Sequence, residues 1–276
     1  MVMPELPEVE TIRKTLLELV RNKQIDEVKV YWENIIKQPA DVQLFKEMLS
    51  GQTILDIGRK GKFLLFELDN YTLISHLRME GKYGVYEQHE PVLNHTHVIF
   101  TFTDGSELRY KDVRKFGTMH LVEKGTASQQ RPLSQLGPDP FSPAFDFDQF
   151  FNKVHKSERT IKSILLDQTV IAGLGNIYVD ETLFKAGIHP ERKGTSLSRD
   201  EVSNIHQKAV DTLELAIEQG GTTIRSYVNS QGQIGMFQQE LYVYGQEKEP
   251  CKQCGGPITK IKVGGRGTHI CLNCQK

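Results

Sequence analysis

The sequence lacks long hydrophobic runs, a marked excess of either charge, and any cysteine before its last 26 residues. No apolar run approaches the roughly 18 residues that a membrane-spanning helix needs. The acidic N-terminal segment also lacks the pattern of a secretory signal peptide. We therefore expect a cytoplasmic protein that does not associate with membranes, and we find no internal repeat in it.

Charge is nearly balanced over the whole chain, with a formal net charge of -1 and an isoelectric point near 6.8. Binding to nucleic acid requires only a locally positive face, so this balance does not exclude it. Basic residues gather in three runs, residues 59–62, 109–115 and 251–276, and the last run has five Lys or Arg and no acidic residue. Each run alone is typical of a solvated surface.

The first half of the 276 residues is rich in strand-like segments. Residues 5–21 come first and have apolar side chains at helical spacing, and Pro7 is tolerated there if it lies in the first turn. Asp104-Gly105, further along, predicts a tight hairpin turn between two strands. Short strands joined by tight turns favour an antiparallel β-sandwich or barrel. The predicted strands are residues 25–32, 53–57, 62–68, 72–77, 97–103, 107–110 and 118–122.

A proline-rich stretch separates these strands from a helical second half. Four prolines between residues 132 and 143 predict a linker. Apolar residues at helical spacing follow and are interrupted at Gly173-Leu174-Gly175 and at Gly220-Gly221. The chain is long enough for two packed domains. We predict an α+β protein with a helix and antiparallel β-sandwich domain at 1–133, a linker at 134–145, a helical domain at 146–244 and a Gly-rich module at 245–276.

The four cysteines form two Cys-x2-Cys pairs separated by 16 residues, which is the spacing of a zinc ribbon. Four thiolates fill the tetrahedral shell of Zn2+ and leave no position for water, so we predict one structural Zn2+. Two disulfides or free thiols are the alternative, which a reducing compartment disfavours. Glycines around Arg266, between the pairs, allow a sharp turn that would present this side chain to a phosphate. The predicted metal ligands are Cys251, Cys254, Cys271 and Cys274.

Five further motifs occur in order along the chain. Residues 4–11 read PELPEVET, and the others are RKGKF at 59–63, SHLRMEG at 75–81, DVRKFG at 112–117 and AGLGNIYVDE at 172–181. Together with the cysteine ribbon, they resemble the motifs of the bacterial formamidopyrimidine-DNA glycosylases, which are 8-oxoguanine glycosylases. The resemblance implies a helix–two-turn–helix element in the helical domain. It also implies a monomer that binds duplex DNA containing an oxidised purine, opposite cytosine.

The resemblance further implies that an N-terminal proline is the nucleophile, and Pro4 matches that proline. Its secondary amine would attack C1′ of the damaged nucleotide, and the iminium with the opened sugar would allow β- and then δ-elimination. A terminal amine titrates near about 8, well below lysine, so more of it is unprotonated at neutral pH.

Inside a chain, however, the proline nitrogen is a tertiary amide that cannot act as a nucleophile. Pro4 follows Met1-Val2-Met3. We therefore expect that translation starts at Met3 or that the leader is removed. A protein that retains Met1 and Val2 should bind lesions without excising them.

Other residues receive roles by the same resemblance. Glu5 matches the general acid, and Glu8, one helical turn further, would be an auxiliary carboxylate. Lys62 matches the family's lysine that assists β-elimination and contacts a phosphate. Arg266 matches the family's arginine that binds the phosphate beside the lesion and assists δ-elimination. Met79 and Phe116 are expected to enter the base stack, and Arg114 to hydrogen-bond the orphaned cytosine. The residues expected to contact the DNA backbone are His76, His95, Asn176 and Tyr244.

A polar, Gly-rich segment at residues 220–238 resembles the loop that caps the extruded base. Main-chain amides around residues 224–227 would read the purine O6. A surface loop without a role is the alternative. The expected loop residues are Thr222, Ile224, Arg225, Ser226 and Tyr227.

Two other functions fit part of the sequence. The endonuclease-eight type shares the fold, the ribbon and the proline chemistry but acts on oxidised pyrimidines; the PELPEVE opening, the Arg114 and Phe116 pair and the long loop favour the purine enzyme. A non-catalytic zinc-ribbon DNA-binding protein would need neither a free Pro4 nor Glu5. Borohydride trapping distinguishes this last class, because only a lyase forms a reducible adduct with DNA.

Overall fold

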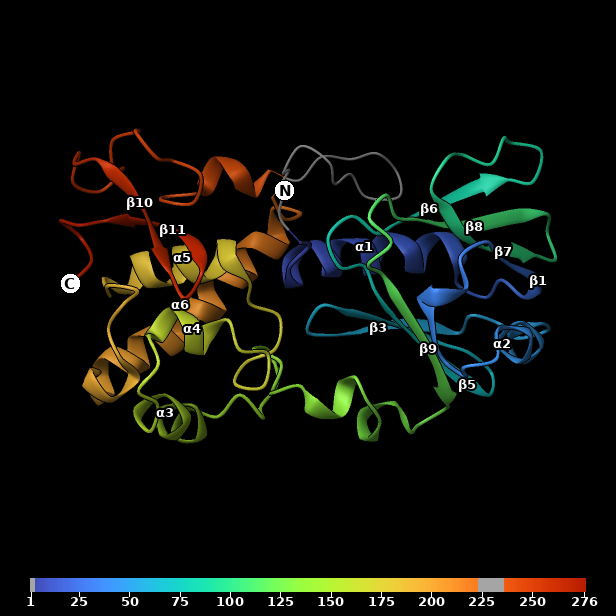
Figure 1. Cartoon of the computed structure of the whole chain (residues 1–276), viewed down its shortest axis with the longest axis horizontal. Helices are drawn as coiled ribbons and strands as arrows, with labels where there is room; N and C mark the ends of the chain where they lie inside the picture. Colours follow the sequence, from blue (N-terminus) through green and yellow to red (C-terminus); the bar gives the residue numbers. More distant parts are fainter. Residues whose placement is uncertain (1–2, 223–235) are drawn as a thin grey trace. The chain divides into compact units, whose positions relative to one another are not determined.

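The computed structural model describes residues 3–222 and 236–276, which separate into two compact units (Figure 1). The N-terminal unit contains residues 3–4 and 8–135. The C-terminal unit contains residues 5–7, 136–222 and 236–276. In the described part of the chain, no helix has the length and apolar character needed to cross a membrane.

Helix α1 (Leu6–Val20) confirms the helix expected at residues 5–21. The apolar stripe that predicted it is buried, with Val9 and Leu16 fully inaccessible. Pro7 lies in the first turn, where its missing N–H breaks no helical hydrogen bond. Glu8 also lies in the first turn, near the positive end of the helix dipole, and is only 6 % exposed.

Two sheets form the rest of the N-terminal unit, as the sequence predicts. One has four strands in the order β1 (Ile25–Val30), β7 (Thr96–Phe102), β8 (Ser106–Lys111) and β6 (Lys82–Glu87). The other has five strands in the order β2 (Ile36–Gln38), β9 (Thr118–Glu123), β5 (Tyr71–His76), β4 (Phe63–Glu67) and β3 (Asp56–Lys60). Apolar side chains from both sheets and from α1 pack into one core cluster, which is the expected arrangement of a sandwich.

Three elements of this unit were not predicted, and one pairing is not antiparallel. Helix α2 (Val42–Leu49) begins after Asp41, whose side chain accepts the N–H groups of the first turn. Strand β6 is an edge strand that contains Gly84 and only one buried apolar side chain, so its alternation is weak. Strand β2 has three residues and pairs with β9 in parallel, which corrects the purely antiparallel prediction.

Helices dominate the C-terminal unit: α3 (Phe147–His155), α4 (Ile161–Leu165), α5 (Asn176–Ala186) and α6 (Arg199–Glu218). Helix α5 is its central element, because eight of its eleven residues are buried. Helix α6 begins with a capping box between Ser198 and Glu201. The pair α4 and α5, joined by the Gly-rich turn at residues 166–175, corresponds to the predicted helix–two-turn–helix element.

The C-terminal module is a hairpin of β10 (Ile258–Val263) and β11 (Arg266–Cys271). Gly264 and Gly265 join the strands with φ of +55° and +79°. Two consecutive residues with positive φ make the two-residue turn that matches the twist of a hairpin, and glycine adopts it without strain. Arg266 is exposed directly after this turn.

Candidate active site and DNA-binding surfaces

The four cysteine sulfurs lie within 4.8 Å of one another. The Sγ atoms of Cys251 and Cys274 are 3.9 Å apart, and those of Cys254 and Cys271 are 3.5 Å apart. Thiolates around a tetrahedral Zn2+ are about 3.8 Å from each other, so this cluster fits the metal. The backbone N–H of Gly256 donates to Sγ of Cys254 and helps to lower the pKa of that thiol to about 7. The cluster is a structural zinc site.

A buried ion pair that was not predicted from the sequence joins the hairpin to the helices. Nζ of Lys162, in α4, donates to Oδ1 of Asp180, in α5, at 2.6 Å and to the hydroxyl of Thr268 at 2.8 Å. Both charged side chains are 0 % exposed. Burial lowers the pKa of Lys162, and the Asp180 carboxylate opposes this effect. Oδ2 of Asp180 accepts the backbone N–H of His269 at 2.9 Å. The backbone that follows Arg266 is therefore held from both helices.

Asn176 and Tyr244, both predicted to contact DNA, lie beside this hairpin. Nδ2 of Asn176, at the start of α5, donates to the carbonyl of Gly267 at 2.9 Å. The ring of Tyr244 packs edge-on against His269, with 4.9 Å between ring centres. Its N–H and the two preceding N–H groups donate to the buried carboxylate of Glu181. Burial raises the pKa of Glu181, and the three donors oppose that rise.

Glu5 is bound to the N-terminus of α5. Its side chain is 1 % exposed, and its carboxylate accepts the N–H of Ile177 at 2.9 Å and that of Tyr178 at 3.4 Å. An anionic carboxylate there is stabilised by the positive end of the helix dipole. The approach needs glycine, because a Cβ on Gly175 would lie 2.3 Å from Cδ of Glu5. Pro4, which precedes Glu5 in the chain, is also buried.

Lys62 lies in the N-terminal unit, in the two-residue turn between β3 and β4, after Gly61 with its φ of +55°. It is only 4 % exposed, so it is not an ordinary solvated lysine. Arg59 holds the turn: it donates to Oε2 of Glu10 at 3.0 Å and to the carbonyl of Gly61 at 3.0 Å. Arg13 donates to the other oxygen of Glu10. Burial tends to raise the pKa of Glu10, but the two guanidinium groups hold it below its ordinary value.

His76 ends β5 and is 5 % exposed. Its Nδ1 accepts the N–H of Arg78 at 2.9 Å, so the proton of the neutral ring is on Nε2. Burial, and then the charges of Arg78 and Lys62, hold the pKa of His76 well below its ordinary value. A neutral imidazole can therefore donate from Nε2 to a phosphate over a wide pH range. Met79 follows in the same loop and is half-buried.

Arg114 and Phe116 lie on the loop that follows β8, and both are exposed, Phe116 by 49 %. The guanidinium of Arg114 lies 4.7 Å from the centre of the Phe116 ring. The buried carboxylate of Asp112 shapes this loop by accepting the N–H groups of Arg114, Phe116 and Gly117 at 2.8–3.0 Å. The N–H of Asp112 donates to the carbonyl of His95, which is itself exposed. No role for Asp112 was predicted from the sequence alone.

Of the predicted capping residues, Thr222 is buried and only 4 % exposed. Ile224, Arg225, Ser226 and Tyr227 lie outside the described residues. Within each unit, the structure thus groups the predicted residues: His76, Met79, Lys62, Arg114 and Phe116 belong to the N-terminal unit, and Glu5, Asn176, Tyr244 and Arg266 belong to the C-terminal unit.

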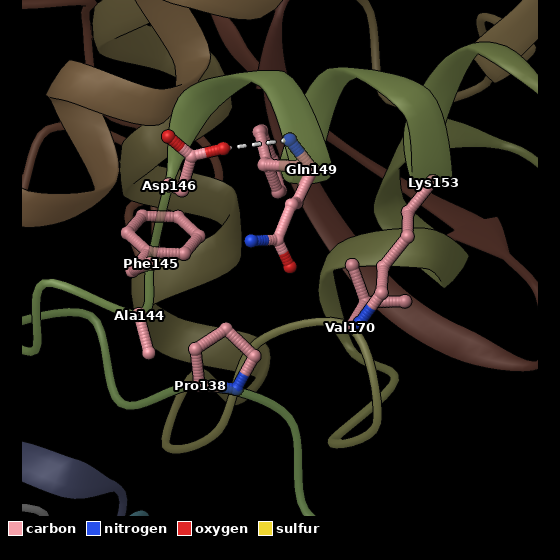
Figure 2. Close-up of a pocket in the computed structure, with 8 residues that line it drawn as sticks. Pro138, Ala144, Phe145, Asp146, Gln149, Lys153 and Val170 are labelled. Carbon is pink, nitrogen blue, oxygen red and sulfur yellow. Dashed lines mark hydrogen bonds between the residues drawn. The ribbon is translucent and has the colours of Figure 1, made fainter.

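A small pocket in the C-terminal unit lies apart from these residues (Figure 2). It is lined by Pro138, Phe145, Lys153 and Val170, and its lining includes the helix cap in which Asp146 accepts the N–H of Gln149. Its cavity of about 10 Å³ has room for one water molecule. It is too small for a nucleobase, so it is not part of the candidate site.

Comparison with known proteins covers nearly the whole chain. Residues 3–119 match the formamidopyrimidine-DNA glycosylase N-terminal domain, residues 136–228 match the H2TH domain of the same enzymes, and residues 248–276 match the zinc finger found in FPG and IleRS. Proteins named formamidopyrimidine-DNA glycosylase are similar over full length. The one from Bacillus licheniformis is 58% identical over 274 residues, covering 99% of this chain and 100% of that protein. The one from Oceanobacillus iheyensis is 59% identical, covering 99% and 98%.

Solved structures agree with these relatives. A Lactococcus lactis FPG variant in complex with DNA that contains Fapy-dG is 42% identical, with a TM-score of 0.93 over 99% of this chain and 100% of that one. The Lactococcus lactis enzyme in complex with DNA containing an abasic site has a TM-score of 0.92 at 42% identity, covering 99% of each chain. The chain therefore belongs to the formamidopyrimidine-DNA glycosylase family, which are DNA glycosylases that act on damaged DNA.

Proposed function

We propose that this chain removes oxidised purines, 8-oxoguanine and formamidopyrimidines, from duplex DNA opposite cytosine and then cuts the strand by β,δ-elimination. It would act as a monomer in the cytoplasm. Support comes from the relatives, whose structures include complexes with Fapy-dG DNA and with abasic DNA. It also comes from the residues that the chain supplies for each chemical step.

The first step needs a nucleophile of low basicity. If the chain begins at Pro4, its secondary amine can attack C1′ of the lesion, the C1′–N bond to the base breaks, and the base leaves with a proton. The nitrogen lone pair then breaks the C1′–O4′ bond, O4′ takes up a proton, and the opened sugar is held as an iminium. The match to the family begins at residue 3, directly before this proline, which favours Pro4 as the functional terminus.

The observation that carries the proposal is the placement of Glu5. Its buried carboxylate is bound by two N–H groups at the N-terminus of α5, and one peptide bond joins it to Pro4. A general acid must lie at a fixed distance from the reacting group, and this anchoring supplies the fixed position. As a carboxylate, Glu5 would accept the proton that the attacking Pro4 amine loses and then pass it to the sugar ring oxygen or the departing base, with Glu8 as an auxiliary carboxylate.

The elimination steps need cations beside the phosphates. Lys62, almost buried in its turn, would assist removal of the C2′ proton and loss of the 3′ phosphate. Arg266, exposed after the glycine turn, would bind the phosphate next to the lesion and assist loss of the 5′ phosphate. His76, His95, Asn176 and Tyr244 would contact the DNA backbone, and the segment 222–227 would cap the extruded base.

The test uses two forms of the protein, one beginning at Pro4 and one that retains Met1, Val2 and Met3. With borohydride and an 8-oxoguanine:cytosine duplex, the first form should become covalently attached to DNA. The second should bind the duplex without attachment, because its proline nitrogen is an amide. Absence of trapping with a verified Pro4 terminus would overturn the proposal. Preferential trapping on thymine glycol duplexes would instead assign the chain to the endonuclease-eight type.

A further inference from the structure

Two loops of the N-terminal unit end in glycine, and both glycines face one oxygen atom. A Cβ on Gly81 would lie 2.2 Å from the hydroxyl oxygen of Tyr110, and a Cβ on Gly117 would lie 1.7 Å from it. Real Cβ atoms essentially never come within 3.0 Å of another heavy atom in this way. Neither glycine has a positive φ, so the close approach, not the backbone conformation, requires glycine at both positions.

Tyr110 is itself held rigidly. It is 0 % exposed, and its ring packs edge-on against Tyr83 with 5.1 Å between the ring centres. Its hydroxyl donates to Oδ2 of Asp112 at 3.5 Å. The same Oδ2 accepts the N–H groups of Phe116 and Gly117 at 2.8 Å each. The hydroxyl of Tyr110 is therefore part of the hydrogen-bond system that shapes the second loop.

The first loop, residues 77–81, reaches the same place from another strand. It is closed by a hydrogen bond of 2.9 Å from the N–H of Gly81 to the carbonyl of Leu77. A Cβ on Gly81 would also lie 2.5 Å from that carbonyl oxygen. The closed loop and the Tyr110 hydroxyl thus fit together only without a side chain at residue 81. This loop carries Met79, and the second loop, residues 112–117, carries Arg114 and Phe116.

We propose that Tyr110 and Asp112 are positioning residues that set the spacing of these two loops, so that Met79, Arg114 and Phe116 enter the base stack as one rigid wedge. The inference rests on the proposed function, because it assigns those three side chains to the stack. Tyr110 and Asp112 act through the loops and touch no DNA. An inserted wedge must be preformed, since a displacement of about 1 Å at such a site can reduce the rate on the order of a hundredfold.

The test measures unstacking, which does not require the proline chemistry. The probe is a duplex with a tetrahydrofuran abasic analogue and a fluorescent 2-aminopurine beside it, which brightens when the stack opens. Tyr110→Phe removes the shared oxygen and should reduce the fluorescence gain on saturation by about threefold, and lower 8-oxoguanine excision on the order of tenfold. Tyr83→Phe is the matched control, because it removes another buried hydroxyl, one that donates to Ser75 and is not among the three atoms nearest to a Cβ on either glycine. It should remain within about twofold of the unmodified protein.

A second substrate separates positioning from general damage to the fold. A single-stranded oligonucleotide with an abasic site has no stack to open. On this substrate, borohydride should trap the Tyr110→Phe variant to the same extent as the unmodified protein. Equal losses on single and double strands, or equal effects of Tyr110→Phe and Tyr83→Phe on unstacking, would overturn the positioning role. Failure of the unmodified protein to be trapped would contradict the proposed function alone, because unstacking is measured by binding.

A pair of substitutions provides a rescue experiment. Gly117→Ala places a methyl group where the Tyr110 hydroxyl lies, and it should abolish most of the fluorescence gain. A methyl group at residue 117 would also lie 2.7 Å from the ring carbon Cζ of Tyr110, so the second substitution is Tyr110→Leu, which removes both the oxygen and the ring and should restore a measurable part of the gain. The effects of substitutions at two residues in contact are not additive. The fluorescence gain of the double variant should therefore be larger than the gain calculated by multiplying the two single effects. A double variant no better than Gly117→Ala would contradict the proposal.

Discussion

The loops at residues 77–81 and 112–117 of the N-terminal unit and the hairpin of the C-terminal unit are held in place by different means. Both loops rest on the apolar sandwich core. The Asp112 carboxylate shapes the loop at residues 112–117 by accepting three of its N–H groups, and a hydrogen bond from the N–H of Gly81 to the carbonyl of Leu77 closes the loop at residues 77–81. The hairpin of Arg266 is held by a metal cluster and by the Lys162–Asp180 ion pair. A buried charge becomes very costly once its partner is removed, whereas an apolar contact loses only its own contribution. The hairpin should therefore be more sensitive to the loss of a single group.

Removal of zinc should have the largest effect. Structural zinc contributes on the order of 10 kcal/mol to the folding of small zinc modules, so Cys271→Ser should unfold the hairpin and lower duplex affinity by more than about a hundredfold. The matched control is Leu272→Ser, at a neighbouring position that is 53% exposed. Metal content and fluorescence anisotropy on tetrahydrofuran-containing duplex are the measurements. The β-sheet signal of the N-terminal unit should persist in the metal-free protein, and its loss would remove the contrast between the two regions.

Loss of the buried lysine should come next. Lys162→Met leaves the Asp180 carboxylate buried without its cation and should lower the free energy of unfolding by about 3–5 kcal/mol. Replacing both residues, Lys162→Met with Asp180→Leu, should recover most of this loss. Lys208→Met in α6 is the control, because its ion pair with Asp211 is more than one-third exposed and contributes at most about 1 kcal/mol. Denaturation in urea with zinc present measures all four proteins. Equal stability of the single and double buried variants would show that the ion pair does not hold the hairpin.

Local signals in the sequence predicted much of the architecture. The apolar periodicity of residues 5–21 gave α1, and Asp104-Gly105 is the turn of the β7–β8 hairpin, with Gly105 at a φ of +84°. The cysteine spacing gave the metal cluster. These features depend on residues that are close together in the chain, so they can be recognised directly in one amino-acid sequence.

The structural elements that the sequence did not reveal depend on distant residues. In the sequence, Asp112 is a single acidic residue within a basic run. Only the folded loop shows its role, because the backbone N–H groups of the loop donate to its carboxylate. Asp180 and Lys162 are 18 positions apart, and only the packing of α4 on α5 joins them. A signal for Lys162 does exist, since it interrupts the buried apolar residues of α4. The roles of Pro4, Glu5, Lys62 and Arg266 came from resemblance to a family, and they stay predictions.

A smaller effect is expected at the turn that carries Lys62. Arg59→Lys keeps a positive charge but cannot bind Glu10 and the Gly61 carbonyl together, so the turn should loosen. We expect strand cleavage to fall by about fivefold while base release falls less, because Lys62 is assigned to elimination. The ratio of released base to cut strand on an 8-oxoguanine duplex is the measurement. Arg21→Lys is the control, since it alters an exposed arginine of the same unit. An unchanged ratio of released base to cut strand would show that Arg59 does not support the elimination step.

The smallest effect concerns the pH dependence of stability in the N-terminal unit. Burial holds the pKa of folded His76 well below 6.5, so the unfolded chain binds its proton first as the pH falls. The stability linked to this group is therefore complete above pH 6.5 and decreases as the pH falls through 6.5 toward the folded pKa, by at most about 1.4 kcal/mol per pH unit. The stability linked to Glu181 changes with pH in the opposite direction. Burial raises the pKa of Glu181 in the folded protein, so its contribution to stability is complete at low pH and is lost as the pH rises through this raised pKa.

His76→Gln should flatten this response in the N-terminal unit and leave that of the C-terminal unit unchanged. Amide hydrogen exchange between pH 7.5 and 5.5 can follow the two units separately, with His89→Gln as the control for an exposed histidine of the same unit. In the unmodified protein, the amides of β5 should lose protection on acidification more than those of α5, because α5 contains Glu181, whose contribution to stability increases in acid. Protonation of His76 would also cost the hydrogen bond from the N–H of Arg78, so the loss should be centred on residues 76–78. If His76→Gln and the unmodified protein lose protection equally in β5, another group must titrate there, and the neutral histidine assigned above would be wrong.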